Sequence, residues 1–170
     1  MDFSFTETIP QSYKAEIRVI SGNDSLALNG REYLVVANKQ QDISIFEIRY
    51  EYHCSPFKEA MLIDHILAVG HEEHFYLYDI NSNRNFYKLK TDGYFGHLYF
   101  NDDLFFVTDA SGIHCIDKAG MVAWQNSSLA VDGVLVNNFE SGKIYGSAEL
   151  DPPGGWEDFV VNLATGKRIS

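Results

Sequence analysis

The fold of this chain is indicated by residues 104–124, which run LFFVTDASGIHCIDKAGMVAW. Three short apolar segments are separated by polar turns that contain Asp, Ser, Lys and Gly. Short runs rich in β-branched and aromatic residues, bounded by turn residues, are typical of β-strands. The stretch therefore predicts three consecutive strands joined by tight turns.

The same pattern recurs along the chain at intervals of about 33 to 40 residues. The strands expected to open the repeats are residues 33–37, 66–70, 104–108 and 143–147. After a polar turn, each is followed by a second strand, at residues 45–48, 77–80, 114–117 and 160–163. The chain is therefore expected to be a single all-β domain, residues 1–170, built from about four antiparallel units.

Antiparallel units at this period are typical of the blades of a small β-propeller, in which each blade packs its apolar faces on its neighbours. An extra strand at residues 13–20 is expected to complete the last blade and close the ring. One turn of helix is expected at residues 55–61, where Ser55 precedes Pro56. The alternative fold is a β-sandwich, because many short strands could also form two packed sheets.

The repeats resemble those of quinoprotein-like and WD-like propellers over roughly residues 26–169. The clearest quinoprotein-like element is residues 120–124, and the Gly-His to Trp-Asp pairing of WD repeats is absent. This resemblance implies the architecture alone. Residues 149–156, with the pattern E-x-D-P-P-G-G-W, also resemble a segment of uncharacterised bacterial proteins, some of them encoded among toxin-immunity genes.

The chain is acidic, with a formal net charge of −11. A negative field repels phosphate backbones and anionic lipid surfaces, so nucleic acid and membrane partners are not expected, and a basic protein is the favoured partner. The N-terminus lacks the basic and apolar regions of a signal peptide, and no apolar run is long enough to span a bilayer. Cys54 and Cys115 fit no ligand pattern and are expected to be reduced, which indicates a cytoplasmic protein of undetermined oligomeric state.

The candidate binding residues are Glu149, Asp151 and Trp156, in a loop whose shape two prolines and two glycines restrict. Two carboxylates beside an indole suit a cation or a basic side chain, through charge pairing and cation–π contact. The structural alternative is a wide hairpin whose tryptophan covers the core.

Enzyme chemistry is not indicated, since no nucleophile, phosphate-binding or calcium-loop motif occurs, and neither a cofactor nor a metal site is expected. The segment His71-Glu72-Glu73-His74 is one residue short of the HExxH zinc motif and is interpreted as a solvated polar turn. The sequence thus favours a non-enzymatic protein-binding module, such as an acidic cytoplasmic partner or an immunity-type protein that masks a basic protein. The alternative is a small-molecule-binding protein or an unrecognised enzyme with its site at the mouth of the propeller.

Overall fold

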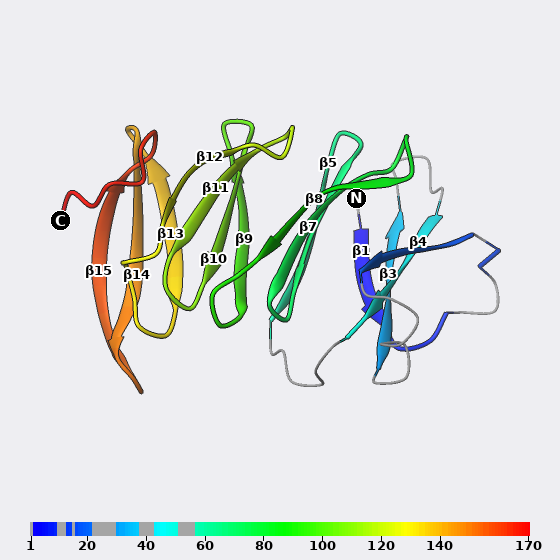
Figure 1. Ribbon diagram of the computed structural model, residues 1–170, viewed down its shortest axis with the longest axis horizontal. Helices are drawn as coiled ribbons and strands as arrows, with labels where there is room; N and C mark the ends of the chain where they lie inside the picture. The colour runs from blue at the N-terminus through cyan, green and yellow to red at the C-terminus, as the bar shows by residue number, and fades with distance from the viewer. Residues whose placement is uncertain (1, 10–12, 15, 22–29, 38–42, 51–56) are drawn as a thin grey trace.

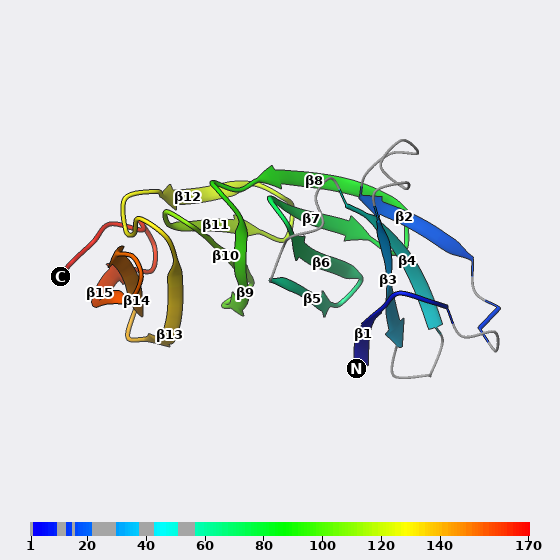
Figure 2. The same ribbon diagram turned by 90° about the horizontal axis from the view of Figure 1, so that it is seen from below.

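The computed structural model describes residues 2–9, 13–14, 16–21, 30–37, 43–50 and 57–170. These residues form fifteen β-strands in four sheets that stand side by side (Figure 1). The sheets follow one another in chain order, with the first and the fourth at opposite ends of the array (Figures 1 and 2). Four separate sheets stacked in sequence confirm the propeller-like array and exclude the two-sheet sandwich.

The first sheet has the strand order β1-β3-β4-β2. Its strands are β1 (Asp2–Thr6), β2 (Ile17–Ser21), β3 (Arg31–Ala37) and β4 (Ile43–Arg49). The β3–β4 hairpin is antiparallel, whereas β2 runs parallel to β4. The expectation that a strand at residues 13–20 completes the last blade is therefore wrong, because β2 belongs to the first sheet. Strand β2 pairs with β4, at the edge of the β3–β4 hairpin. The described residues form an open array instead of a closed ring (Figure 2).

The second and third sheets are regular four-stranded antiparallel meanders. The second contains β5 (Lys58–Ile63), β6 (Ile66–His71), β7 (His74–Asp79) and β8 (Arg84–Lys90). The third contains β9 (Phe95–Asn101), β10 (Leu104–Asp109), β11 (Ile113–Asp117) and β12 (Val122–Asn126). The helical turn expected at residues 55–61 is wrong where it can be compared, because residues 58–61 lie in β5; residues 55 and 56 lie outside the described part of the chain.

The fourth sheet has three strands, β13 (Val134–Glu140), β14 (Lys143–Asp151) and β15 (Gly155–Asn162). The segment after β15 returns along its free edge. Arg168 forms a β-bridge with Val161, and the amide of Ile169 donates to the carbonyl of Val160 at 2.7 Å. This short return covers part of the edge, as a fourth strand would.

Apolar side chains alternate along each central strand and fill the spaces between successive sheets. In β6, Leu67 and Val69 pack toward the first sheet, and Ile66 and Ala68 pack toward the third. In β10, Phe106 packs toward the fourth sheet. A strand buried on both faces needs a continuous apolar run, which explains the sequences of these strands. Cys115 is buried in the same way, which bears out the expectation of a buried thiol, whereas Cys54 lies outside the described residues.

The strands expected to open the last three repeats, at residues 66–70, 104–108 and 143–147, are instead the second strands of their sheets, β6, β10 and β14. The first strands of these sheets lie along one side of the array. Figure 2 shows β5, β9 and β13 on its concave side, with β8 and β12 on the convex side. Strand β9 contacts both β5 and β13. The segments that lead into these three strands therefore come together along one edge of the array, where the strands begin.

The second and third sheets are in close contact at Gly70. A β-carbon at this position would lie 1.9 Å from Cε2 of Phe95, whose side chain is fully buried. We expect Gly70→Ala to lower the free energy of unfolding by about 1–3 kcal/mol, because overpacking forces buried neighbours to move. Urea denaturation would measure the change.

A double-mutant cycle with Phe95→Leu separates the contact from a general effect of the substitution. We expect Gly70→Ala to cost less in the Phe95→Leu background, since the smaller side chain removes the clash. An equal cost in both backgrounds would contradict the assignment.

Candidate functional site

The residues that precede β5, β9 and β13 meet the β14–β15 hairpin around a pocket of about 360 Å³. We call it the acidic aromatic pocket. The side chains that define it are Phe57, Tyr94, His97, Asp132, Glu149 and Trp156. Its walls thus come from the second, third and fourth sheets.

The β14–β15 hairpin places Glu149 opposite Trp156 in register. The Glu149 side chain accepts a hydrogen bond from the Gly154 amide at 2.5 Å, which ties the Pro-Gly loop to the end of β14. The carbonyl of Glu149 accepts from the Val131 amide at 2.8 Å, and its amide donates to the Gly133 carbonyl at 3.0 Å. These bonds bring the segment before β13 against the hairpin.

Gly133 separates two of the aromatic walls. A β-carbon at this position would lie 3.2 Å from both Cη2 of Trp156 and the hydroxyl oxygen of Tyr94, and the backbone φ is +146°. Glycine is therefore favoured by the positive φ, and a β-carbon would in addition displace the Trp156 and Tyr94 side chains by a few tenths of an ångström. Its small size lets the indole and the phenol line the same pocket.

The remaining aromatic wall is built at the start of β9. The ring of Phe57 stacks on Tyr94 with centroids 5.8 Å apart and lies 5.4 Å from the ring of His97. Nδ1 of His97 lies 2.6 Å from Oε1 of Glu59, whose other oxygen accepts from the amide of Leu98. The imidazole is therefore fixed from behind by a neighbouring carboxylate.

The pocket is electrically negative. Burial raises the pKa of the Tyr94 hydroxyl, and the charges of Asp132 and Glu149 raise it further. That hydroxyl donates to the carbonyl of Asp132 at 2.8 Å. Among the described residues that line the pocket, there is no lysine or arginine to offset the carboxylates. The arrangement suits a cationic group.

Two of the three sequence-predicted binding residues, Glu149 and Trp156, line this pocket. Asp151 does not, since it lies at the exposed end of β14, beside Gly155. Phe57, Tyr94, His97 and Asp132 also line the pocket and were not predicted from the sequence. Phe57 and Tyr94 directly precede the first strand of a sheet, and Asp132 lies two residues before β13. Their similar positions in the repeat are the signal that could have found them.

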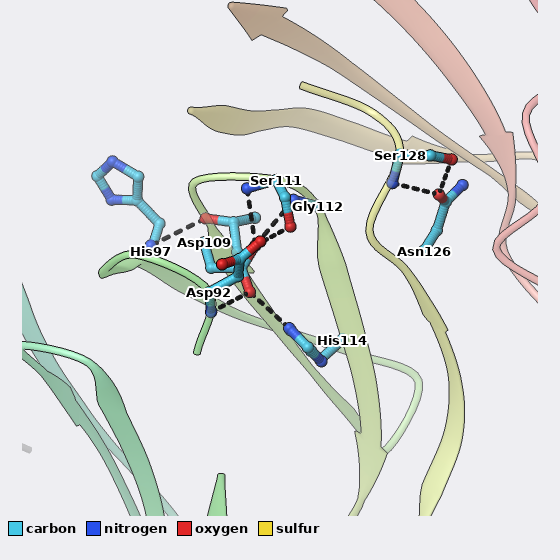
Figure 3. Close-up of polar contacts among 9 residues, drawn as sticks. Asp92, His97, Asp109, Ser111, Gly112, His114, Asn126 and Ser128 are labelled. Atoms are coloured by element: carbon cyan, nitrogen blue, oxygen red, sulfur yellow. Dashed lines mark hydrogen bonds and ion pairs between the residues drawn. The ribbon is translucent and has the colours of Figure 1, made fainter. Parts of the chain in front are cut away.

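Asp109 accepts hydrogen bonds from two backbone segments that lie beside the pocket, and Figure 3 shows these bonds. Its Oδ1 accepts from the amides of Ser111 at 3.0 Å and Gly112 at 2.8 Å. Its Oδ2 accepts from the Asp92 amide at 3.0 Å and lies 2.7 Å from Nε2 of His114. An ionised carboxylate can only accept, so this nitrogen carries a proton. We call this set of bonds the Asp109 clamp.

Two of the segments that link successive sheets form hydrogen bonds to the turn that the clamp holds. The Ala110 amide donates to the Asp92 carbonyl at 3.2 Å, before β9, and the Ala110 carbonyl accepts from the Gly133 amide at 2.8 Å, before β13. The turn that Asp109 holds thus touches both segments that lead into the pocket. Other aspartates make simpler turns of the kind expected from the sequence, such as Asp117, whose Oδ1 accepts from the amides of Ala119 and Met121.

The turn at residues 71–74 is not the solvated polar turn that the sequence suggested. His71 is 1% exposed, Glu72 4% and His74 7%. His71 stacks on Tyr76, with centroids 5.5 Å apart, and its Nδ1 lies 3.8 Å from Oε2 of Glu72. Within the described part of the chain, neither ring nitrogen forms a hydrogen bond. Burial, with a smaller contribution from His74, lowers the pKa of His71 to about 3. The neutral ring of His71 therefore packs in the interior, which the polar composition of the turn does not indicate.

No cluster of three or more metal-ligating side chains occurs among residues 2–9, 13–14, 16–21, 30–37, 43–50 and 57–170. In the same ranges, the structure contains no helix long and apolar enough to cross a membrane.

Comparison with solved structures identifies the architecture. A chain of the Mitotic Checkpoint Complex matches 99% of this chain, with a TM-score of 0.58 and 11% identity, over 52% of its own length. BamB from Moraxella catarrhalis matches 98%, with a TM-score of 0.52 and 10% identity, over 51% of its own length. The C-terminal WD40 domain of Sif2 matches 83%, with a TM-score of 0.51 and 15% identity, over 42% of its own length.

The chain is a β-propeller-like array. It spans about half the length of these structures, which agrees with its open arrangement of four sheets. No protein-family model matches it, and neither does any curated protein sequence.

The Asp109 clamp can be tested by Asp109→Asn. We expect this change to lower the free energy of unfolding by about 2–3 kcal/mol, because hydrogen bonds to a buried charge are worth more than neutral ones. Asp92→Asn is the matched control, since the exposed Asp92 contributes its backbone to the clamp. Equal stability of the two variants in urea denaturation would contradict the assignment.

We expect the stabilisation by the Asp109 clamp to depend on pH. Burial opposes ionisation of Asp109, but its bonds with His114 and the amides outweigh burial and hold its pKa below the ordinary 3.8. The stabilisation is therefore present above pH 3.8 and is lost as pH falls through the lowered pKa. The stability difference between wild type and Asp109→Asn should shrink over that range.

We expect burial of His71 to make the free energy of unfolding depend on pH in a second, higher pH range. The unfolded chain takes up a proton below pH 6.5, whereas buried His71 stays neutral down to about pH 3. Stability should therefore fall as pH decreases through this window, by up to about 1.4 kcal/mol per pH unit. His71→Phe should flatten the profile, and substitution of the exposed His65 by Gln should not. An unchanged profile in His71→Phe would contradict the prediction.

Proposed function

We propose that this chain is a non-enzymatic protein-binding module that holds a basic segment of a partner protein in the acidic aromatic pocket. The observation that carries the proposal is the convergence of Trp156, Tyr94 and Phe57 with two carboxylates in one concave site. Rigid aromatic side chains give large contact area at low entropic cost and are common binding hot spots. The carboxylates supply the attraction for a basic side chain.

The charge of the whole chain supports the same function. A net charge of −11 attracts a basic protein from a distance and increases the association rate. An acidic module of this kind could cover a basic active or nucleic-acid-binding surface, which is the immunity-type role suggested by the resemblance at residues 149–156.

A small cationic molecule is the second candidate ligand. A volume of about 360 Å³ falls within the range of small-molecule sites. The site is a pocket and not a flat acidic face, which is the specific observation that favours this candidate.

The experiment is a binding titration with peptides of matched length that are rich in lysine and arginine or in glutamate. We expect the basic peptides to bind and the acidic peptides not to bind. Binding should weaken as salt rises, because screening reduces the attraction between exposed charges. Fluorescence anisotropy of labelled peptides would measure the dissociation constants.

Two substitutions assign that binding to the pocket. We expect Trp156→Ala and Glu149→Gln each to weaken the binding of basic peptides by about tenfold, through loss of cation–π contact and of charge. Glu140→Gln is the matched control, because Glu140 is an exposed carboxylate at the other end of the same sheet. Equal weakening by Glu140→Gln would show attraction by net charge alone and would count against the proposed site.

A further inference from the structure

Several hydrogen-bond acceptors around the acidic aromatic pocket are already used within the protein. Oε1 of Glu149 already accepts from the amide of Gly154, and the carbonyl of Asp132 accepts from the hydroxyl of Tyr94. Behind the wall, Glu59 is engaged by His97 and by the amide of Leu98. A cation that forms hydrogen bonds to these atoms would compete with bonds that the protein makes to itself.

An unmodified lysine ammonium is such a cation. It carries three N–H donors and is strongly hydrated, so entry into a pocket requires replacement of those water contacts. Methylation removes donors and weakens hydration while the positive charge stays. The resulting group interacts favourably with the faces of aromatic rings.

Two of the aromatic side chains that line the pocket are partly exposed to solvent. Trp156 is 43% exposed and Phe57 is 37% exposed, both high for side chains of this size. Trp156 comes from the β14–β15 hairpin, Tyr94 precedes β9 and Phe57 precedes β5, so rings from three segments line one space. The charges of Asp132 and Glu149 lie at the same space and favour a cation over a neutral group of equal shape.

We propose that the acidic aromatic pocket binds a methylated ammonium group, as presented by a methylated lysine side chain or by a free choline-like molecule. This inference rests on the proposed function and names the chemistry that the pocket selects. The aromatic rings provide the contact surface, and the two carboxylates provide the charge.

The test is an NMR titration of the ¹⁵N-labelled protein, followed at the indole N–H of Trp156, which Trp156→Phe assigns. The probes are four: a short Gly-Ser peptide with one central trimethyllysine, the same peptide with lysine, the same peptide with the neutral tert-butyl isostere of trimethyllysine, and free choline. We expect the trimethyllysine peptide to bind about tenfold more tightly than both the lysine peptide and the neutral isostere.

Variants assign the effect to the pocket. Tyr94→Ala should abolish the preference for trimethyllysine. Trp156→Phe, which is followed at backbone amides because it lacks the indole N–H, should retain part of it, because a smaller ring still offers an aromatic face. Phe3→Ala is the matched control, since Phe3 is an exposed aromatic residue in the first sheet and lies outside the pocket. Folding of each variant is checked by its ¹⁵N spectrum.

The outcomes separate the inference from the proposed function. Equal or tighter binding of the lysine peptide would overturn the inference and leave the protein-binding proposal standing. Equal binding of the neutral isostere would also overturn the inference, because shape alone would then explain affinity. Binding of choline without binding of either cationic peptide would support the chemistry and overturn the proposal of a protein partner. No response to any of the four probes would overturn both.

Discussion

The hydrogen bonds of the buried Asp109 carboxylate are the interaction on which the geometry of the acidic aromatic pocket depends. A charge in the interior is tolerated only when its oxygens are fully hydrogen-bonded, and Asp109 meets this requirement with backbone amides and one imidazole. Because those amides belong to the β10–β11 turn and to the segment before β9, satisfying the charge also positions the chain. The positions of Tyr94 and Asp132 follow from this local electrostatic requirement.

Much of the fold could be predicted from the sequence because the physical constraint on each central strand is the same. A strand that packs on a sheet at either face must be apolar throughout, and such runs recur in β6 and β10. The N-terminal pairing could not be predicted in this way. Strand β2 joins β4 in parallel, and a pattern of alternating side chains does not specify which free edge a strand will join.

The candidate site was only partly predictable for a related reason. The Pro-Gly loop is conspicuous in the sequence, and it contains Glu149 and Trp156. Phe57 and Tyr94 lie far away in the chain and acquire a role only because equivalent ends of successive sheets meet. The segment at residues 71–74 shows the converse error, since His71 and Glu72 are polar yet buried. Burial at a turn is set by the neighbouring sheet, which local composition does not reveal.

The linear order of the four sheets has a thermodynamic consequence. Each of the three apolar clusters found in the described chain joins one sheet only to the next, so the total stability is approximated by a sum over nearest-neighbour interfaces. In such a system a terminal unit can detach at the cost of one interface, whereas an internal unit must break two. The acidic aromatic pocket draws its walls from the last three units, and detachment of the C-terminal unit alone would remove Trp156 from it. Occupation of the pocket would therefore act as an additional coupling between neighbours and would raise the cooperativity of unfolding at that end of the array.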